Sequence, residues 1–128
     1  MVLITRLARA IYRLSTEDVL GMRLKPYILL DTLREAGPVP QQALGEALTL
    51  DPNNLVLLLN EVEAAGWAER HRDPHDRRRH IVAITAAGRK ALDRAEQGME
   101  GVEDEVLASL GPRQRAALRE LLHKALQV

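Results

Sequence analysis

The sequence predicts a mainly α-helical domain that carries one small β-hairpin. Aromatic residues make up only 2% of the 128 residues, so the core must be built from Leu, Ala, Val and Ile. Such a core favours small interlocking helices over a β-sandwich. Apolar residues recur at helical spacing along most of the chain, and one β-branched run, residues 80–85, departs from that spacing. These two patterns together indicate helices interrupted by a hairpin.

The composition excludes several classes of protein. The chain holds 18 Lys plus Arg and 18 Asp plus Glu, so its formal net charge is zero, and its 46% of hydrophobic residues excludes wholesale disorder. The absence of cysteine excludes disulfides, thiolate metal sites and cysteine nucleophiles. No uninterrupted apolar run approaches ~18 residues, so no membrane span is expected. The length corresponds to one domain.

The first helix is expected to run from near Val2 to about Leu20. One side of its helical wheel is apolar and another side is basic, formed respectively by Leu3, Leu7, Ile11 and Leu14 and by Arg6, Arg9 and Arg13. A transit peptide or a helix lying on a membrane surface would show a similar pattern. We favour an amphipathic helix of the domain, because a transit peptide would remove a sizeable part of it and the apolar stripe is narrow for a membrane surface.

A pair of short helices with a tight turn between them is expected after a second helix that starts at Pro26 and stops at Gly37-Pro38. The first of the pair starts near Pro40 or Gln41. The second starts at Asp51-Pro52, where Asp51 can cap the free amides, and it runs to about Ala65. Gly66 can then end it in the left-handed conformation. This arrangement is typical of a helix-turn-helix.

A β-hairpin, which we call the wing, follows directly. Its strands are expected at residues 67–72 and 80–85, and turn-forming residues 73–76 lie between them. Thr85 is placed to cap a long helix whose stripe is Leu92, Ala95, Met99, Val102 and Val106. Gly98 and Gly101 interrupt that helix, so they bend it or admit a close neighbour. Gly111-Pro112 starts the last helix. A helix-turn-helix followed by such a hairpin is a winged helix-turn-helix.

Positive charge is gathered on the wing. Residues 70–79 hold five arginines against two aspartates, whereas residues 93–105 hold six acids and one arginine. A bare arginine run is more often a solvated loop than a binding site. On a wing that follows a helix-turn-helix, contact with duplex DNA is favoured instead.

At this point the sequence resembles the MarR family of bacterial transcriptional regulators over nearly its whole length. The matching stretches are residues 50–56, 62–67 and, most specifically, the wing motif 72–79 with the Thr-x-x-Gly pattern of residues 85–88. The resemblance implies a homodimer built from residues 1–22 and 88–128, with residues 23–87 as the DNA-binding lobe. It also implies binding to pseudo-palindromic double-stranded DNA, repression, and release by a small, often phenolic, ligand, in the cytoplasm.

The resemblance also implies roles for individual residues. It places Asn53, Asn54, Val56 and Leu57 against base edges, Arg77, Arg78 and Arg79 on the wing against DNA, and Gln41 and Gln42 at phosphates. Asp73 would shape the wing turn and Asp76 would steady the arginines. One departure is notable: relatives commonly carry a basic residue near Leu57, and this chain has none between Asp51 and Glu69. An alternative is therefore a dimeric interaction module with weak or lost DNA binding.

Other chemistry has little support in the sequence. Tyr12, Tyr27 and Trp67 are candidates for lining an effector pocket, although each could equally fill the core. Histidines 71, 75 and 80 do not line up on one face of a hairpin, and His123 belongs to the last helix, so no metal site is expected. No phosphate-binding Gly-rich loop and no Gly-x-Ser-x-Gly motif occurs. We expect no enzyme activity and no cofactor.

Overall fold

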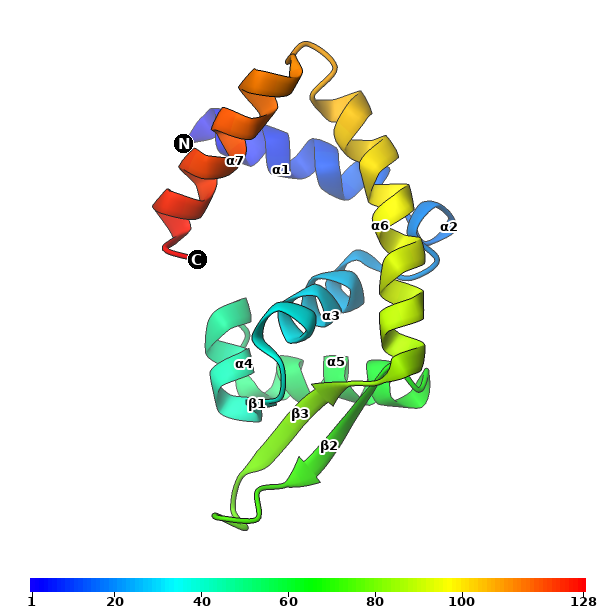
Figure 1. Cartoon of the computed structure of the whole chain (residues 1–128), viewed down its shortest axis with the longest axis vertical. Helices are drawn as coiled ribbons and strands as arrows, with labels where there is room; N and C mark the ends of the chain where they lie inside the picture. Colours follow the sequence, from blue (N-terminus) through cyan, green and yellow to red (C-terminus); the bar gives the residue numbers. More distant parts are fainter.

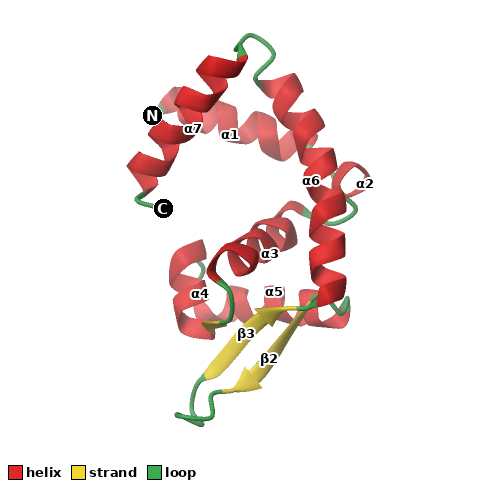
Figure 2. Ribbon diagram, in the orientation of Figure 1, coloured by secondary structure: helices red, strands yellow, loops and turns green.

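A computed structural model describes all residues, 1–128, and shows a helical chain with a small antiparallel sheet (Figures 1 and 2). The elements in chain order are α1 (Val2–Leu14), α2 (Glu17–Leu20), α3 (Leu24–Ala36), β1 (Val39–Pro40), α4 (Gln41–Leu48), α5 (Pro52–Ala64), β2 (Ala68–Arg72), β3 (His80–Ile84), α6 (Ala86–Val106) and α7 (Pro112–Leu126). The predicted fold class, mainly α with a β-hairpin wing, is confirmed.

Helix α6 connects two parts of the molecule. At one end, α3, α4, α5 and the sheet form a compact lobe, residues 24–84, from which the β2–β3 hairpin projects (Figure 1). At the other end, α1 and α7 lie with the outer part of α6, and both chain termini are found there (Figure 1). Helix α6 contacts α1, α2 and α3, so it spans from the lobe to the terminal helices.

The hydrophobic core lies inside the lobe and continues beneath α6. It consists of Leu20, Met22, Leu29, Leu30, Leu33, Leu44, Leu55, Leu58, Leu59, Val62, Ala68, Val82, Leu92 and Ala95. Leucine dominates this set, as the near absence of aromatic residues predicts. Neither α1 nor α7 contributes a buried residue, so the terminal helices have no core of their own within one protomer.

The sheet has three strands rather than the two of the expected hairpin. Its order is β1-β3-β2, and both pairings are antiparallel, with Val39 opposite Val82 and Ala68 opposite Ile84. A strand of two residues is too short to show any alternation of apolar residues, so the sequence prediction missed β1. Pro40 is tolerated because it lies at the edge of the sheet, where a strand can dispense with some of its N–H donors.

The prediction of one continuous first helix was wrong. Helix α1 ends at Leu14, and the Thr16 hydroxyl then accepts a hydrogen bond from the Val19 amide at 3.4 Å, which starts the separate helix α2. Gly21 ends α2 with φ of 77°, a left-handed conformation that glycine adopts without steric cost. The break allows the chain to bury Leu20 in the lobe core while α1 stays with the terminal helices. Helix α3 also starts at Leu24, earlier than the expected Pro26.

The predicted helix caps are confirmed. The Asp51 carboxylate accepts from the Asn54 amide at 3.0 Å, and the Thr85 hydroxyl accepts from the Gly88 amide at 3.0 Å. Gly66 follows α5 with φ of 80°. These contacts fix where α5 begins and ends and where α6 starts, so they set the position of the hairpin between the two helices.

Gly98 lies where α2 crosses α6. A Cβ atom added there would lie 2.2 Å from the backbone oxygen of Val19, whereas one added at Gly101 would meet nothing within 4 Å. The sequence predicted that these glycines either bend the helix or admit a close neighbour. At Gly98 it is the close approach of a neighbour that applies. Helix α2 can pack against α6 only because this position has no side chain.

Candidate nucleic-acid interface

The start of α5 is held by a double contact between Asp51 and Asn54. Asp51 Oδ1 accepts the Asn54 backbone N–H at 3.0 Å, and Oδ2 accepts the Asn54 side-chain Nδ2 at 2.6 Å. These hydrogen bonds, first among them the one from the Asn54 backbone, hold the pKa of Asp51 below its ordinary value. Because Nδ2 is turned toward the carboxylate, the side-chain carbonyl of Asn54 is left without a partner in the protein.

Helix α5 has one buried face and one exposed face. Its buried face is the predicted apolar stripe, Leu55, Leu58, Leu59 and Val62. The exposed face carries Asn53, Asn54, Val56, Leu57 and Asn60, and Leu57 is 66% exposed. The structure therefore places the sequence-predicted base-contacting residues together on the solvent side of one helix. That surface offers amides and aliphatic groups but no cation.

The turn of the wing is organised by two aspartates. Asp73 accepts the His75 N–H through Oδ1 at 2.9 Å, and its own N–H donates to the Arg79 carbonyl at 2.9 Å. Asp76 accepts the Arg78 N–H at 3.1 Å and the Arg78 Nε at 3.4 Å. Asp73 thus shapes the turn as predicted, and Asp76 steadies Arg78. These bonds give the tip of the wing a defined backbone course.

The wing arginines divide into two groups. Arg70 pairs with Glu63 on α5 and donates to Asn60 Oδ1 at 3.0 Å, and Arg72 donates to the Arg77 carbonyl at 2.8 Å. These two side chains hold the hairpin to itself and to α5. The other three arginines, 77, 78 and 79, are exposed, and the Arg78 side chain is 92% exposed. This second group is exposed to a partner, and its one ion pair is the local contact of Arg78 with Asp76.

A concave surface brings the wing arginines close to two helix starts. Gln41 and Gln42 at the start of α4, Asp51 and Pro52 at the start of α5, and Arg78, Arg79 and His80 of the wing all line it. Gln41 Oε1 is buried there without a hydrogen-bond partner. Gln41 and Gln42, expected at phosphates, therefore share one hollow with Arg78 and Arg79, expected against DNA, although almost forty positions separate them in sequence. Arg77 does not line it.

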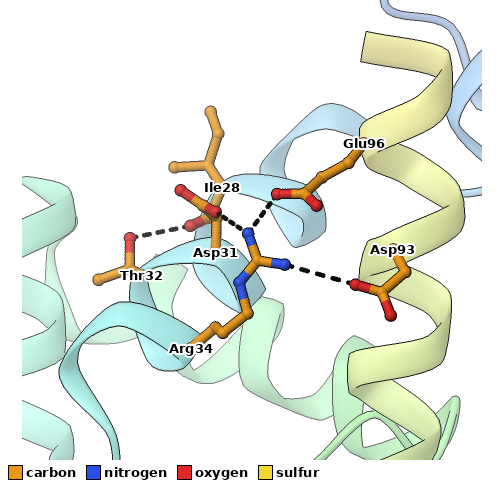
Figure 3. Close-up of polar contacts among 6 residues, drawn as sticks. All are labelled: Ile28, Asp31, Thr32, Arg34, Asp93 and Glu96. Atoms are coloured by element: carbon orange, nitrogen blue, oxygen red, sulfur yellow. Dashed lines mark hydrogen bonds and ion pairs between the residues drawn. The ribbon is translucent and has the colours of Figure 1, made fainter. Parts of the chain in front are cut away.

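Arg34 ties the lobe to α6. Its guanidinium forms ion pairs with Asp31 on its own helix and with Asp93 and Glu96 on α6 (Figure 3). The hydrogen bond with Glu96 raises the pKa of Arg34 and lowers the pKa of Glu96. Burial, in contrast, raises the pKa of Asp31. This cluster fixes how the lobe, and with it α5, is oriented relative to the long helix.

Comparison with known proteins identifies the family. A family model described as the MarR family matches residues 26–80, which lie within the lobe. The transcriptional regulator HosA of Escherichia coli O111:H- is 30% identical over 98 residues, covering 77% of this chain and 73% of HosA. The chain belongs to the MarR family. A regulatory protein for the hcr operon of Thauera aromatica is 31% identical across 77% of the chain, a match that spans 59% of that protein's own length.

Solved structures of MarR proteins share the fold. A mutant MarR from Escherichia coli complexed with operator DNA superposes with a TM-score of 0.81 and 26% identity, covering 97% of this chain and 91% of that one. A MarR-family regulator from Rhodococcus reaches a TM-score of 0.87 at 24% identity, with 97% and 89% coverage, which shows the fold alone. The MarR winged helix-turn-helix architecture therefore extends over 97% of the chain, beyond the residues matched by the family model.

The three aromatic candidates for an effector pocket do not come together on one surface. Tyr27 and Trp67 pack against the lobe core, and Tyr12 on α1 is 57% exposed. An apolar groove does exist in this MarR protein, but it is lined by side chains of α1, α6 and α7, and none of the three aromatic residues borders it. No group of three potential metal-binding side chains is found, and no helix is long and apolar enough to cross a bilayer.

The fold of this MarR protein also brings to α5 residues that the sequence did not indicate. Arg23 and Lys25 precede and begin α3, yet they lie beside Asn54 and Leu57 in a small hollow. Arg34 was likewise not singled out, although it makes three ion pairs. The Asp31–Arg34 spacing is the one local signal. The other partners lie 29 to 62 positions away in the chain, so spacing along the sequence could not have found them.

Proposed function

We propose that this protein is a transcriptional regulator that binds specific double-stranded DNA as a homodimer, acting in the cytoplasm, where bacterial operators lie. The observation that carries the proposal is the exposed face of α5, which presents Asn53, Asn54, Val56 and Leu57 beside a wing with three exposed arginines. An α-helix fits the major groove, and a wing can reach the adjacent backbone or minor groove.

The exposed face of α5, which is proposed to recognise bases, is neutral. Asparagine can bind adenine through its N6 and N7 atoms, and aliphatic side chains can contact the thymine methyl group. Asn53 and Asn54 supply the amides, while Leu57, 66% exposed, supplies the apolar contact. We therefore propose that the preferred operator is enriched in A·T steps at the positions facing α5.

The concave surface is proposed to supply the affinity for the phosphate backbone. Arg78 and Arg79 line it from the wing, and Gln41 and Gln42 line it from the start of α4. Cationic side chains displace counterions from DNA without distinguishing its sequence. The side-chain amides of the two glutamines, together with the first N–H groups of α4, can donate to phosphate oxygens.

The proposed homodimer follows from the apolar groove on the terminal helices. Leu7, Ile11, Met99, Val102, Val106, Leu107, Leu118, Leu122 and Leu126 line it. Helices α1 and α7 bury no residue within one protomer, so a second copy is needed to cover these apolar side chains. In this assignment residues 1–22 and 88–128 form the dimer region and residues 23–87 form the DNA-binding lobe, so two copies of α5 are presented to successive major grooves.

Repression and its relief by a small aromatic molecule complete the proposal. A dimer held on a promoter blocks transcription, and a ligand that reorients the lobe would release it. The Tyr27 phenol is a neutral hydrogen-bond donor at physiological pH, because the ordinary pKa of tyrosine is already about 10 and burial raises the pKa of Tyr27 to about 12. Titrating the DNA complex with a panel of aromatic acids tests this part: release of DNA supports it, and unchanged binding across the panel contradicts it.

Selection of bound fragments from random duplex DNA tests the main proposal. Enrichment of an inverted repeat whose halves lie about one helical turn apart supports a dimeric sequence-specific regulator. Recovery without enrichment would favour the alternative, a dimeric interaction module whose exposed Leu57 contacts another protein. Variants with Asn53→Ala and Asn54→Ala serve as controls, because a specific regulator should lose the enriched sequence when the amides are removed.

A further inference from the structure

Helix α5, counted with its cap, carries three acids and no basic residue. Asp51 caps its start, and Glu61 and Glu63 lie in its last two turns. In the major groove a helix lies between two phosphate strands, one on each side. A negative helix can enter there only if neighbouring elements supply positive charge along both of its sides.

On the side facing the hairpin, the wing supplies that charge. Arg70 neutralises Glu63 and holds Asn60, while Arg78 and Arg79 extend past the start of α5. The backbone on that side of the groove therefore meets exposed guanidinium groups. No hairpin residue lines the hollow on the opposite side of α5, so positive charge on that side has to come from another element.

On that opposite side, Arg23 and Lys25 face α5. They line a hollow together with Asn54, Leu57 and Glu61, which are spaced three and four residues apart and so form one stripe of the helix. Arg23 donates from Nε to Glu61 Oε2 at 3.1 Å and from Nη2 to the other carboxylate oxygen, and these bonds raise its pKa. Its Nη1 donates no hydrogen bond within the protein, and Lys25 is exposed and forms no ion pair.

We propose that Lys25 and Arg23 form a second binding site for DNA phosphates, on the side of α5 away from the wing. The inference rests on the proposed function, since it concerns the same DNA. Lys25 contributes a free ammonium, and Arg23 contributes a guanidinium that Glu61 holds beside the helix. With the wing on one side and this pair on the other, both strands bordering the groove meet a cation, and the net negative charge of α5 is offset.

The test measures how salt weakens binding to a mixed-sequence synthetic duplex, using the full chain. Each phosphate contact that is lost should reduce the slope of log affinity against log salt by about 0.9. Lys25→Gln and Arg23→Gln are each expected to reduce the slope by that amount per lobe. Arg78→Gln serves as the positive control. Arg113→Gln is the matched negative control, because Arg113 is exposed, forms no ion pair, does not line the apolar groove and belongs to the start of α7, at the end of the molecule opposite the wing (Figure 1).

Arg23→Lys separates charge from structure. It removes the paired hydrogen bonds to Glu61 but keeps the charge, so its slope should stay at the unmodified value while that of Arg23→Gln falls. If the Arg23 variants unfold, Lys25→Gln still tests the phosphate site, because the Lys25 side chain forms no ion pair whose loss would destabilise the fold. An unchanged slope for Lys25→Gln, with a reduced slope for Arg78→Gln, would overturn this site and leave the proposed function standing. No salt-dependent binding by the unmodified protein would overturn both.

Discussion

The two carboxylate oxygens of Asp51 bind the same residue, Asn54, one through its backbone N–H at 3.0 Å and the other through its side-chain amide at 2.6 Å. The reverse amide orientation would set two oxygens against each other at that distance, so Asn54 has one favoured orientation. A cap that begins a helix therefore also orients a side chain proposed to contact a base.

The substitution Asp51→Ser tests this coupling. Serine caps a helix well but has a single oxygen, so it can hold the Asn54 backbone amide and must release the side chain. We expect the melting temperature to change little. Discrimination between the right and the wrong base at one base pair should decrease by part of the roughly 1–3 kcal/mol that an oriented amide supplies. Affinity for non-specific DNA should rise because a negative charge is removed. Unchanged discrimination measured on single-base operator variants would contradict the coupling.

The substitution Arg78→Ala tests the role of the wing. Its side chain is 92% exposed, so little stability should be lost, while affinity for every DNA sequence should fall and the salt dependence should flatten by about one ion per contact. Arg77→Ala should behave in the same way. Arg72→Ala is the contrasting variant. The Arg72 side chain donates to the Arg77 carbonyl, so its removal should loosen the turn. A salt slope that survives in Arg78→Ala would argue against wing contact.

The substitution Leu122→Glu tests the dimer. Leu122 lines the apolar groove, so a carboxylate there would have to be desolvated when a second copy covers it. We expect sedimentation velocity to show a monomer, with DNA affinity reduced because two half-sites can no longer be bound together. Ala116→Glu, on α7 but outside the groove, should remain dimeric. A dimer that persists in Leu122→Glu would place the seam elsewhere.

A pair of glycine variants tests the crossing of α2 and α6. Gly98→Ala would bring a Cβ to 2.2 Å from the Val19 backbone oxygen, and we expect a loss of about 1–3 kcal/mol from forced displacement. Gly101→Ala meets open space in the same helix and should stabilise it by about 0.5–1 kcal/mol. Chemical denaturation measures both. Equal effects of the two substitutions would show that helix propensity, and not the crossing, governs Gly98.

The Arg34 cluster predicts an acid-dependent loss of stability. The hydrogen bond from Arg34 lowers the pKa of Glu96, so Glu96 stabilises the fold above its unfolded pKa, and this contribution is lost as the pH falls through its lower folded value. Arg34→Met should cost about 1 kcal/mol at neutral pH and flatten the acid limb of the stability curve. Asp31, whose pKa is raised by burial, contributes in the opposite sense.

Asp31→Asn is the control for that prediction, since it removes a charge that the folded state penalises. It should therefore be neutral or mildly stabilising near pH 7. Urea denaturation at a series of pH values distinguishes the variants. An acid limb that is as steep in Arg34→Met as in the unmodified protein would show that other carboxylates control it.

The sequence by itself determined the features that depend on neighbours along the chain. The Asp51 and Thr85 caps, the left-handed Gly66, the apolar stripe of α5 and the wing turn at Asp73 each involve hydrogen bonds or spacings within a few residues. Such features can be predicted from the sequence because the interacting groups are close in the chain, whatever the rest of the fold is. The family motif on the wing belongs to the same class.

Only the tertiary structure decided which charged groups are free. Arg70 and Arg78 lie in one arginine-rich segment, yet Arg70 pairs with Glu63 on α5 and is largely covered, whereas Arg78 contacts only Asp76 in its own turn and reaches solvent. The short strand β1, the break that lets Leu20 reach the core, and the placement of Lys25 beside α5 depend in the same way on elements distant in sequence. Folding sets these contacts through space, where the position of a partner cannot be read from spacing along one chain.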